Sequence, residues 1–61
     1  MQTLTIRQKQ ILDYLRHYGM EHGYPPSFRE IAAHFNINLG TVQDHLKALI
    51  RKGVLVQQAN H

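Results

Sequence analysis

The chain has 61 residues, of which 43% are hydrophobic and 18% charged, a composition typical of one small folded domain and not of a disordered segment. Because a domain of this size buries only roughly 60% of its unfolded surface, it has little room for a deep substrate cavity. It contains no cysteine, which excludes disulfides and thiolate zinc sites, and its net charge of +3 favours a polyanionic partner if the basic residues share one face.

The first predicted helix covers residues 6–22. Thr5 can serve as its N-cap, and Gln8, three residues later, completes a capping box. Gly23 and the two prolines that follow Tyr24 end the helix. Apolar side chains recur at helical spacing along one face of this segment: Ile11, Leu12, Leu15 and Tyr18.

The second predicted helix is short and covers residues 28–35. It begins with another capping box, formed by Ser27 and Glu30. Asn36 tolerates the left-handed backbone conformation and can reverse the chain, while Asn38 can cap the helix that follows. Three residues supply the side of this helix that we expect to be buried: Ile31, Ala32 and Phe35.

The third predicted helix covers residues 39–52 and stops at Gly53. After it, residues 54–56 have the composition of a short strand. On a helical wheel one arc is apolar and is expected to be buried: Leu39, Val42, Leu46, Leu49 and Ile50. The opposite side carries a polar stripe: Gly40, Asp44, Lys47 and Arg51.

A helix, a three-residue turn and a second helix form a helix-turn-helix motif. This motif projects its second helix, so that the outer side of that helix can enter a DNA major groove about 12 Å wide. We therefore expect a mainly α fold, a three-helix winged helix-turn-helix with a short C-terminal β strand, over residues 1–56, and a frayed tail (the start of the wing) over residues 57–61. The small, turn-forming and apolar positions of the motif are filled by Ala32, Asn36, Ile37 and Val42.

The polar side of the third helix supplies the candidates for reading base edges. Gln43 can bond adenine, and Asp44 can accept from cytosine, although Asp44 could equally be a solvated partner of Lys47. The expected base contacts are Asn38, Gly40, Thr41, Gln43 and Asp44. The expected phosphate contacts are Arg7, Ser27, Arg29, Lys47, Arg51 and Lys52, the alternative for each basic residue being an ordinary solvated charge.

Five histidines raise the possibility of a metal site: His17, His22, His34, His45 and His61. No two are spaced four residues apart and no HExxH motif occurs, so we expect no bound metal and no cofactor. Protonating all five would raise the formal charge from +3 to +8 (3 + 5), so DNA affinity should rise below about pH 6.5.

Three blocks of the sequence resemble the N-terminal DNA-binding domain of the LexA repressors: LTIRQKQILDYL, GYPPSFREIA and HLKALIRKGVL. The resemblance covers residues 4–56. It implies a winged helix-turn-helix that binds operator DNA and represses genes of the DNA-damage (SOS) response. Between Phe35 and Val42 the chain looks one residue shorter than the family pattern, which has a serine-rich run where Leu39 to Thr41 stand. The operator sequence of the family is therefore not carried over.

The resemblance also bears on partners and catalysis. LexA proteins have a C-terminal domain that dimerises them and cleaves the chain with a serine and a lysine, whereas Ser27 is the only serine here and acts as a cap. We therefore expect no enzyme activity, and a homodimer only on DNA or through a missing dimerisation domain. The alternative function is a protein-interaction module, which should present an apolar outer face on the third helix. With no membrane span and no signal peptide, we expect a cytoplasmic, nucleoid-associated protein of bacterial or phage origin.

Overall fold

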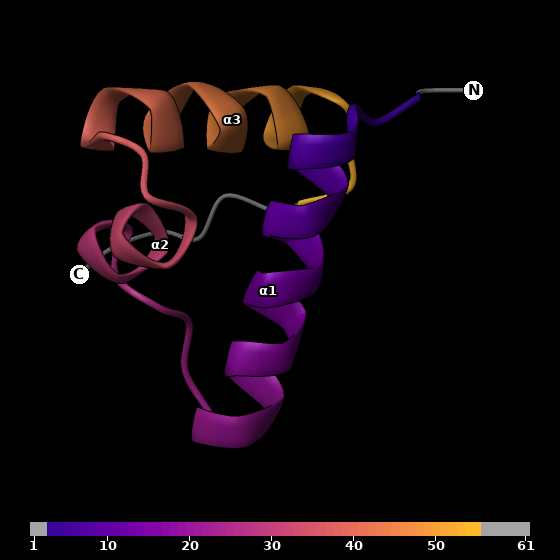
Figure 1. Cartoon of the computed structure of the whole chain (residues 1–61). Helices are drawn as coiled ribbons and strands as arrows, with labels where there is room; N and C mark the ends of the chain where they lie inside the picture. Colours follow the sequence, from indigo (N-terminus) through magenta and orange to yellow (C-terminus); the bar gives the residue numbers. More distant parts are fainter. Residues whose placement is uncertain (1–2, 56–61) are drawn as a thin grey trace, which may run out of the picture.

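The computed structural model describes residues 3–55 and contains three helices: α1 (Ile6–His22), α2 (Phe28–Phe35) and α3 (Leu39–Arg51). In Figure 1, α3 lies across the beginning of α1, and α2 is seen end-on below the beginning of α3. Both α1 and α2 pack against α3. The prediction of a mainly α helix-turn-helix fold is confirmed, and the third helix ends one residue earlier than predicted, with Lys52 as its C-cap.

The helix boundaries follow from local side-chain bonds. Thr5 and Gln8 form the predicted capping box at the start of α1, where the Thr5 Oγ1 accepts from the Gln8 N–H at 3.1 Å. Ser27 and Glu30 form the corresponding box at the start of α2. Gly23 ends α1 with a φ of 79°, in the left-handed region that glycine adopts without strain.

The turn between α2 and α3 depends on Asn36. This residue has a φ of 56° and a ψ of 48°, as predicted, and is the one non-glycine residue with positive φ in the described part of the chain. The Ile37 N–H donates to the Ala32 carbonyl at 3.0 Å, which closes the end of α2 in a Schellman arrangement. Ile37 then packs against the core, so the reversed chain is held and α3 leaves in a new direction.

The core lies where the three helices meet. It contains Ile11 and Leu12 from α1, Ile31 from α2, and three residues of α3: Val42, Leu46 and Leu49. Leu39, which we expected in the buried arc, is 41% exposed, so that expectation was wrong. It occupies the first position of α3 and is not among the side chains that pack against the core, whereas Val42, nearly one turn later, is fully buried.

The predicted strand falls at the edge of the described residues. Val54 and Leu55 form a bend, and no strand is present among residues 3–55. A strand needs a neighbouring strand to satisfy its backbone groups, and the described part of the chain offers none. Val56 and the tail 57–61, with the expected wing, lie outside the described residues. No helix in the described range is both long and apolar enough to cross a bilayer.

Candidate nucleic-acid interface

The outer face of α3 is polar and exposed, because the packing of the core uses the opposite side of the helix. Val42, Leu46 and Leu49 turn inward and are buried. Thr41, beside the polar stripe, is half-buried. Gln43 and the four positions of the stripe are all exposed: Gly40, Gln43, Asp44, Lys47 and Arg51. The structure therefore brings most of the predicted base-contact residues onto one accessible surface.

The beginning of α3 is capped by Asn38 alone. The Asn38 Oδ1 accepts from the Thr41 N–H at 2.8 Å, so only the amide group of this side chain is left for another partner. The first turn contains no acidic residue. The first backbone bond of the helix runs from the Val42 N–H to the Asn38 carbonyl. The N–H groups of Leu39 and Gly40 come before it and have no acceptor within the helix. Two donors at the positive end of the helix dipole are thus available to an anion.

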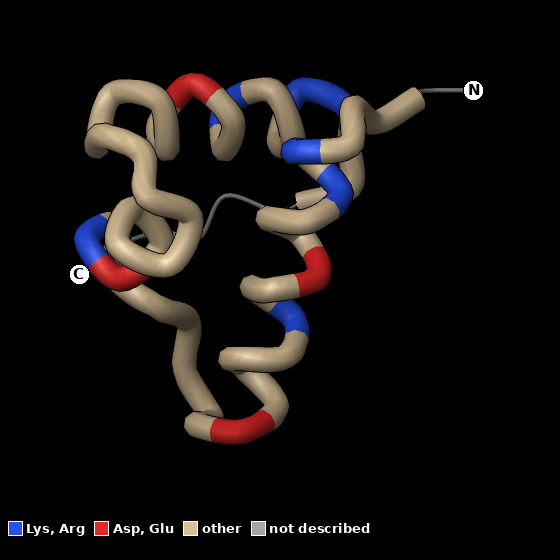
Figure 2. Tube along the Cα trace, viewed as in Figure 1, with Lys and Arg blue, Asp and Glu red and all other residues tan. Residues whose placement is uncertain are grey.

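The predicted phosphate contacts differ in how free their side chains are. Lys47 and Arg51 are exposed on α3, and neither forms an ion pair within the described range, where the one ion pair joins Lys9 to Asp13 at 3.2 Å. The Arg7 guanidinium lies over the Phe35 ring, 5.2 Å from its centroid. Figure 2 shows basic positions gathered at the corner where the end of α3 meets the start of α1.

Lys52 is held within the protein. Its Nζ donates to the Thr3 carbonyl at 2.8 Å and to the Gln8 Oε1 at 2.7 Å. The same Gln8 oxygen accepts from the Thr5 N–H, so the ammonium group joins the end of α3 to the capping box of α1. The geometry therefore gives Lys52 a structural contact that its sequence position, directly after Arg51, did not suggest.

The beginning of α2, where we expected a phosphate near Ser27 and Arg29, already holds a carboxylate. One Glu30 oxygen accepts from the Ser27 N–H at 3.0 Å, and the other accepts from the Tyr18 hydroxyl at 2.7 Å. The Ser27 N–H, followed by the Tyr18 hydroxyl, lowers the pKa of Glu30 below its usual value. The same carboxylate raises the pKa of Tyr18, because the protonated phenol is its hydrogen-bond donor. Arg29 is exposed beside this charge.

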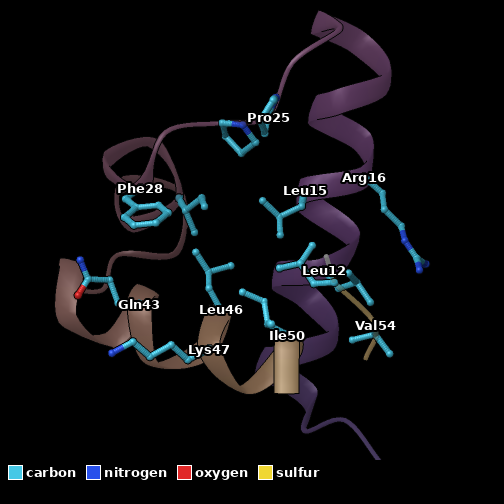
Figure 3. Close-up of a pocket in the computed structure, with 13 residues that line it drawn as sticks. Leu12, Leu15, Arg16, Pro25, Phe28, Gln43, Leu46, Lys47, Ile50 and Val54 are labelled. Atoms are coloured by element: carbon cyan, nitrogen blue, oxygen red, sulfur yellow. The ribbon is translucent and has the colours of Figure 1, made fainter. Parts of the chain in front are cut away.

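An apolar groove of about 730 Å³ lies between the three helices. Figure 3 shows that Gln43 and Lys47 stand at its α3 edge, and Arg16 lines it from α1. Apolar side chains supply most of its lining, among them Leu12, Leu15, Phe28, Leu46, Ile50 and Val54. The groove is chemically unlike the outer face of α3, and the two surfaces meet only along the row that contains Gln43 and Lys47.

Two of the described histidines, His22 and His34, pack against aromatic rings. His34 is stacked on Tyr14 with 4.1 Å between ring centroids, and His22 lies 4.0 Å from Tyr18 by the same measure. No group of three metal-ligating side chains occurs within residues 3–55. His45 is half-buried on α3, on a side that the outer polar stripe does not use.

Comparison with known proteins agrees with this geometry. The sequence matches the family described as LexA DNA binding domain over residues 1–61. It is 52% identical over 59 residues to the LexA repressor of Sorangium cellulosum, covering 95% of this chain and 26% of that protein. It is 52% identical over 62 residues to LexA repressor 1 of Geobacter sulfurreducens, covering 98% of this chain and 30% of the relative.

A second Geobacter sulfurreducens protein, LexA repressor 2, is 50% identical over 60 residues, covering 95% of this chain and 29% of the relative. The chain therefore spans less than a third of the length of these curated relatives. The resemblance drawn from the three sequence blocks is confirmed. Because the family match extends over all 61 residues, the chain belongs to the LexA DNA-binding domain family.

Proposed function

We propose that this domain binds double-stranded DNA in a sequence-specific manner, with α3 in the major groove, and that it acts in transcriptional repression of the LexA type. The observation that carries the proposal is the exposed, polar and partly basic outer face of α3, whose beginning is free of acidic residues. A helix about 12 Å across with its side chains fits the width of the major groove. The resemblance to LexA supports the further proposal that the controlled genes belong to the response to DNA damage.

The base contacts are assigned to the first two turns of α3. Gln43 is placed against adenine and Asp44 against the amino group of cytosine, with Asp44 pairing with Lys47 as the competing role. Thr41 and the amide of Asn38 reach the neighbouring edges. Gly40 has no side chain and lets the backbone approach the bases, where even a Cβ would meet nothing closer than the Asn38 Oδ1, at 3.4 Å.

The phosphate contacts are assigned first to Lys47 and Arg51, which are exposed on α3 itself, and then to Arg7 and Arg29 on the two other helices. Two more residues were predicted from the sequence to bind phosphates, Ser27 and Lys52. We give Ser27 a lesser role because the Glu30 carboxylate occupies the adjoining helix terminus. Lys52 contributes its positive charge, but its bonds to Thr3 and Gln8 favour a structural role.

We base the proposed stoichiometry and cellular setting on the family. We propose that one domain recognises one half-site, and that dimerisation occurs on DNA or through a segment outside these 61 residues. The domain corresponds to a non-catalytic part of the relatives, and we propose that self-cleavage lies outside it. A repressor of this kind works on the chromosome, in the bacterial nucleoid.

The test is a titration of the domain against fluorescently labelled duplexes, one selected by the domain from a random pool and one scrambled, at several salt concentrations. We expect tighter binding to the selected duplex and a log–log salt slope of several units, about 0.9 per phosphate contact. Gln43→Ala should reduce the preference for the selected duplex about 5- to 150-fold. Lys47→Ala should weaken binding to both duplexes and reduce the slope by about one.

A matched control removes a lysine from another surface. Lys9→Ala lowers the net charge by the same unit, but its ammonium is already paired with Asp13 on α1. Equal loss of slope in Lys9→Ala and Lys47→Ala would mean that net charge alone controls affinity and that α3 has no special place. Absence of binding at low salt would instead favour a protein-interaction module, for which the apolar groove is the available surface.

A further inference from the structure

Leu39 is a large apolar residue that the packing of the domain does not use. It is 41% exposed, at the first position of α3. Two other exposed apolar side chains, Phe28 and Val54, line the groove between the helices, but Leu39 does not. The groove therefore does not explain why Leu39 is exposed. Leu39 lies at the N-terminal end of α3, the helix that is proposed to enter DNA.

Its neighbours are residues that are assigned to base recognition. Leu39 follows the cap residue Asn38 and precedes Gly40, both of which are exposed. It is four residues before Gln43, so the two side chains lie on the same side of α3 in adjacent turns. Gln43 is exposed as well. The start of α3 thus presents an apolar group directly beside an amide that can bond adenine.

The major groove offers one apolar group to such a side chain. Among the base edges exposed there, only thymine carries a methyl group, at C5. We infer that Leu39 contacts the C5-methyl of a thymine adjacent to the base read by Gln43, and that this contact makes thymine preferred at that position. The inference rests on the proposed function and names a determinant of its specificity that hydrogen-bonding residues alone would not supply.

The size of the effect follows from the area of one methyl group. Removing a methyl or methylene group from water changes a binding constant about four-fold. Uracil has the same hydrogen-bonding groups as thymine and lacks only the methyl. Replacing a single thymine by uracil therefore measures this contact without altering base pairing.

The experiment uses the 61-residue chain and the duplex that it selects from a random pool. Each thymine of that duplex is replaced in turn by uracil, and binding is measured by fluorescence anisotropy. For the unaltered chain we expect about a four-fold loss at one or two thymines. Leu39→Ala should bind the thymine and uracil duplexes equally, while Met20→Ala, which shortens a side chain that is 83% exposed on α1, should keep the full difference.

The outcomes separate this inference from the proposed function. A thymine preference that persists in Leu39→Ala would overturn the role of Leu39 and leave DNA recognition by α3 intact, as would a selected duplex in which no thymine methyl matters. Failure of the chain to enrich any sequence would overturn the proposed function and the inference together. Circular dichroism of Leu39→Ala, expected to match that of the unaltered chain, ensures that a loss of preference is not a loss of fold.

Discussion

The starts of α2 and α3 are both capped, but by different groups. At the start of α2, both oxygens of the Glu30 carboxylate are engaged, one by the Ser27 N–H at 3.0 Å and one by the Tyr18 hydroxyl at 2.7 Å. At the start of α3, the neutral side chain of Asn38 accepts from Thr41, and no acidic residue lies in the first turn. The start of α1 resembles that of α2, because the side chain of its third residue, Gln8, also accepts two hydrogen bonds. Its Oε1 accepts from the Thr5 N–H and from the Lys52 Nζ.

This difference separates a helix start at which the protein supplies its own anion from one at which an external anion can bind. The N-terminus of a helix carries a partial positive charge and attracts anions. At α2 the protein supplies that anion itself in Glu30, so a phosphate would meet a negative charge. At α3 the site is left open, beside the exposed residues Gly40 and Gln43. The comparison therefore supports the proposed contact of DNA with the start of α3, and it favours a structural role for the start of α2.

Ile31 lies in the core where the three helices meet, so its truncation should have the largest effect. Ile31 is 1% exposed, and Ile31→Ala should lower the free energy of unfolding by about 2–5 kcal/mol, because a cavity replaces its side chain. For so small a domain this loss should remove most helical signal at 37 °C, measured by circular dichroism and urea unfolding. Met20→Ala is the control, with a change within about 0.5 kcal/mol. A similar small change in Ile31→Ala would show that α2 is not anchored by this core.

Removing the two caps compares the helix starts directly. Ser27→Ala and Asn38→Ala should each lower the free energy of unfolding by about 1 kcal/mol, because each leaves one backbone N–H without its acceptor. The effects on DNA should differ. Asn38→Ala should weaken binding of the folded protein more than Ser27→Ala does, as measured by anisotropy at a temperature where both variants are fully folded. Equal weakening in the two variants would show that both helix starts meet DNA.

The sequence was sufficient for the parts of the fold that depend on neighbouring residues. The capping boxes at Thr5 and Ser27 gave the correct first residues of α1 and α2, because those bonds span only three positions. Asn36 was correctly expected in the left-handed region for the same local reason. Leu39 was misplaced because helical spacing gives the direction of a side chain, but not whether a neighbouring helix extends far enough to cover it.

The site was less predictable because it depends on contacts between distant positions. The ammonium of Lys52 reaches the carbonyl of Thr3, which is 49 residues away in the sequence. The link from Tyr18 to Glu30 joins α1 to α2. From the sequence alone, Lys47 and Lys52 were equally good phosphate contacts, and only their different surroundings in the structure distinguish them.

Lys52 and Lys47 therefore provide a test of whether the bonds of Lys52 to the start of α1 stabilise the fold and take no part in DNA binding. Lys52→Met should lower the free energy of unfolding by about 0.5–1 kcal/mol, because the Thr3 carbonyl and the Gln8 Oε1 each lose a charged donor. The Gln8 Oε1 then keeps only its bond from the Thr5 N–H. It should leave the salt slope of DNA binding nearly unchanged. Lys47→Met should leave stability nearly unchanged and reduce the slope by about one. The reverse pattern would assign Lys52 to DNA and remove the distinction between the two lysines.

The smallest expected effect concerns the charge that closes α2. Hydrogen bonds from the Ser27 N–H and the Tyr18 hydroxyl lower the pKa of Glu30 in the folded protein. The folded state therefore binds a proton less tightly than the unfolded state, in which the pKa of Glu is about 4.3. The resulting stabilisation is fully present above that value and is lost as the pH falls through the lower, folded-state pKa.

Glu30→Gln preserves the geometry of the capping box but removes this titration. We expect the unaltered protein to melt at a higher temperature than Glu30→Gln at pH 7, and the two melting temperatures to converge as the pH falls below the ordinary Glu pKa of about 4.3 and through the lower, folded-state pKa. Glu21→Gln removes the same charge from the end of α1 and corrects for net charge. Tyr18→Phe should move the convergence to higher pH, because the carboxylate keeps the Ser27 N–H but loses its second donor. A constant difference between the unaltered protein and Glu30→Gln across this range would show that the start of α2 is not closed by a charged group, and the contrast with α3 would lose its electrostatic basis.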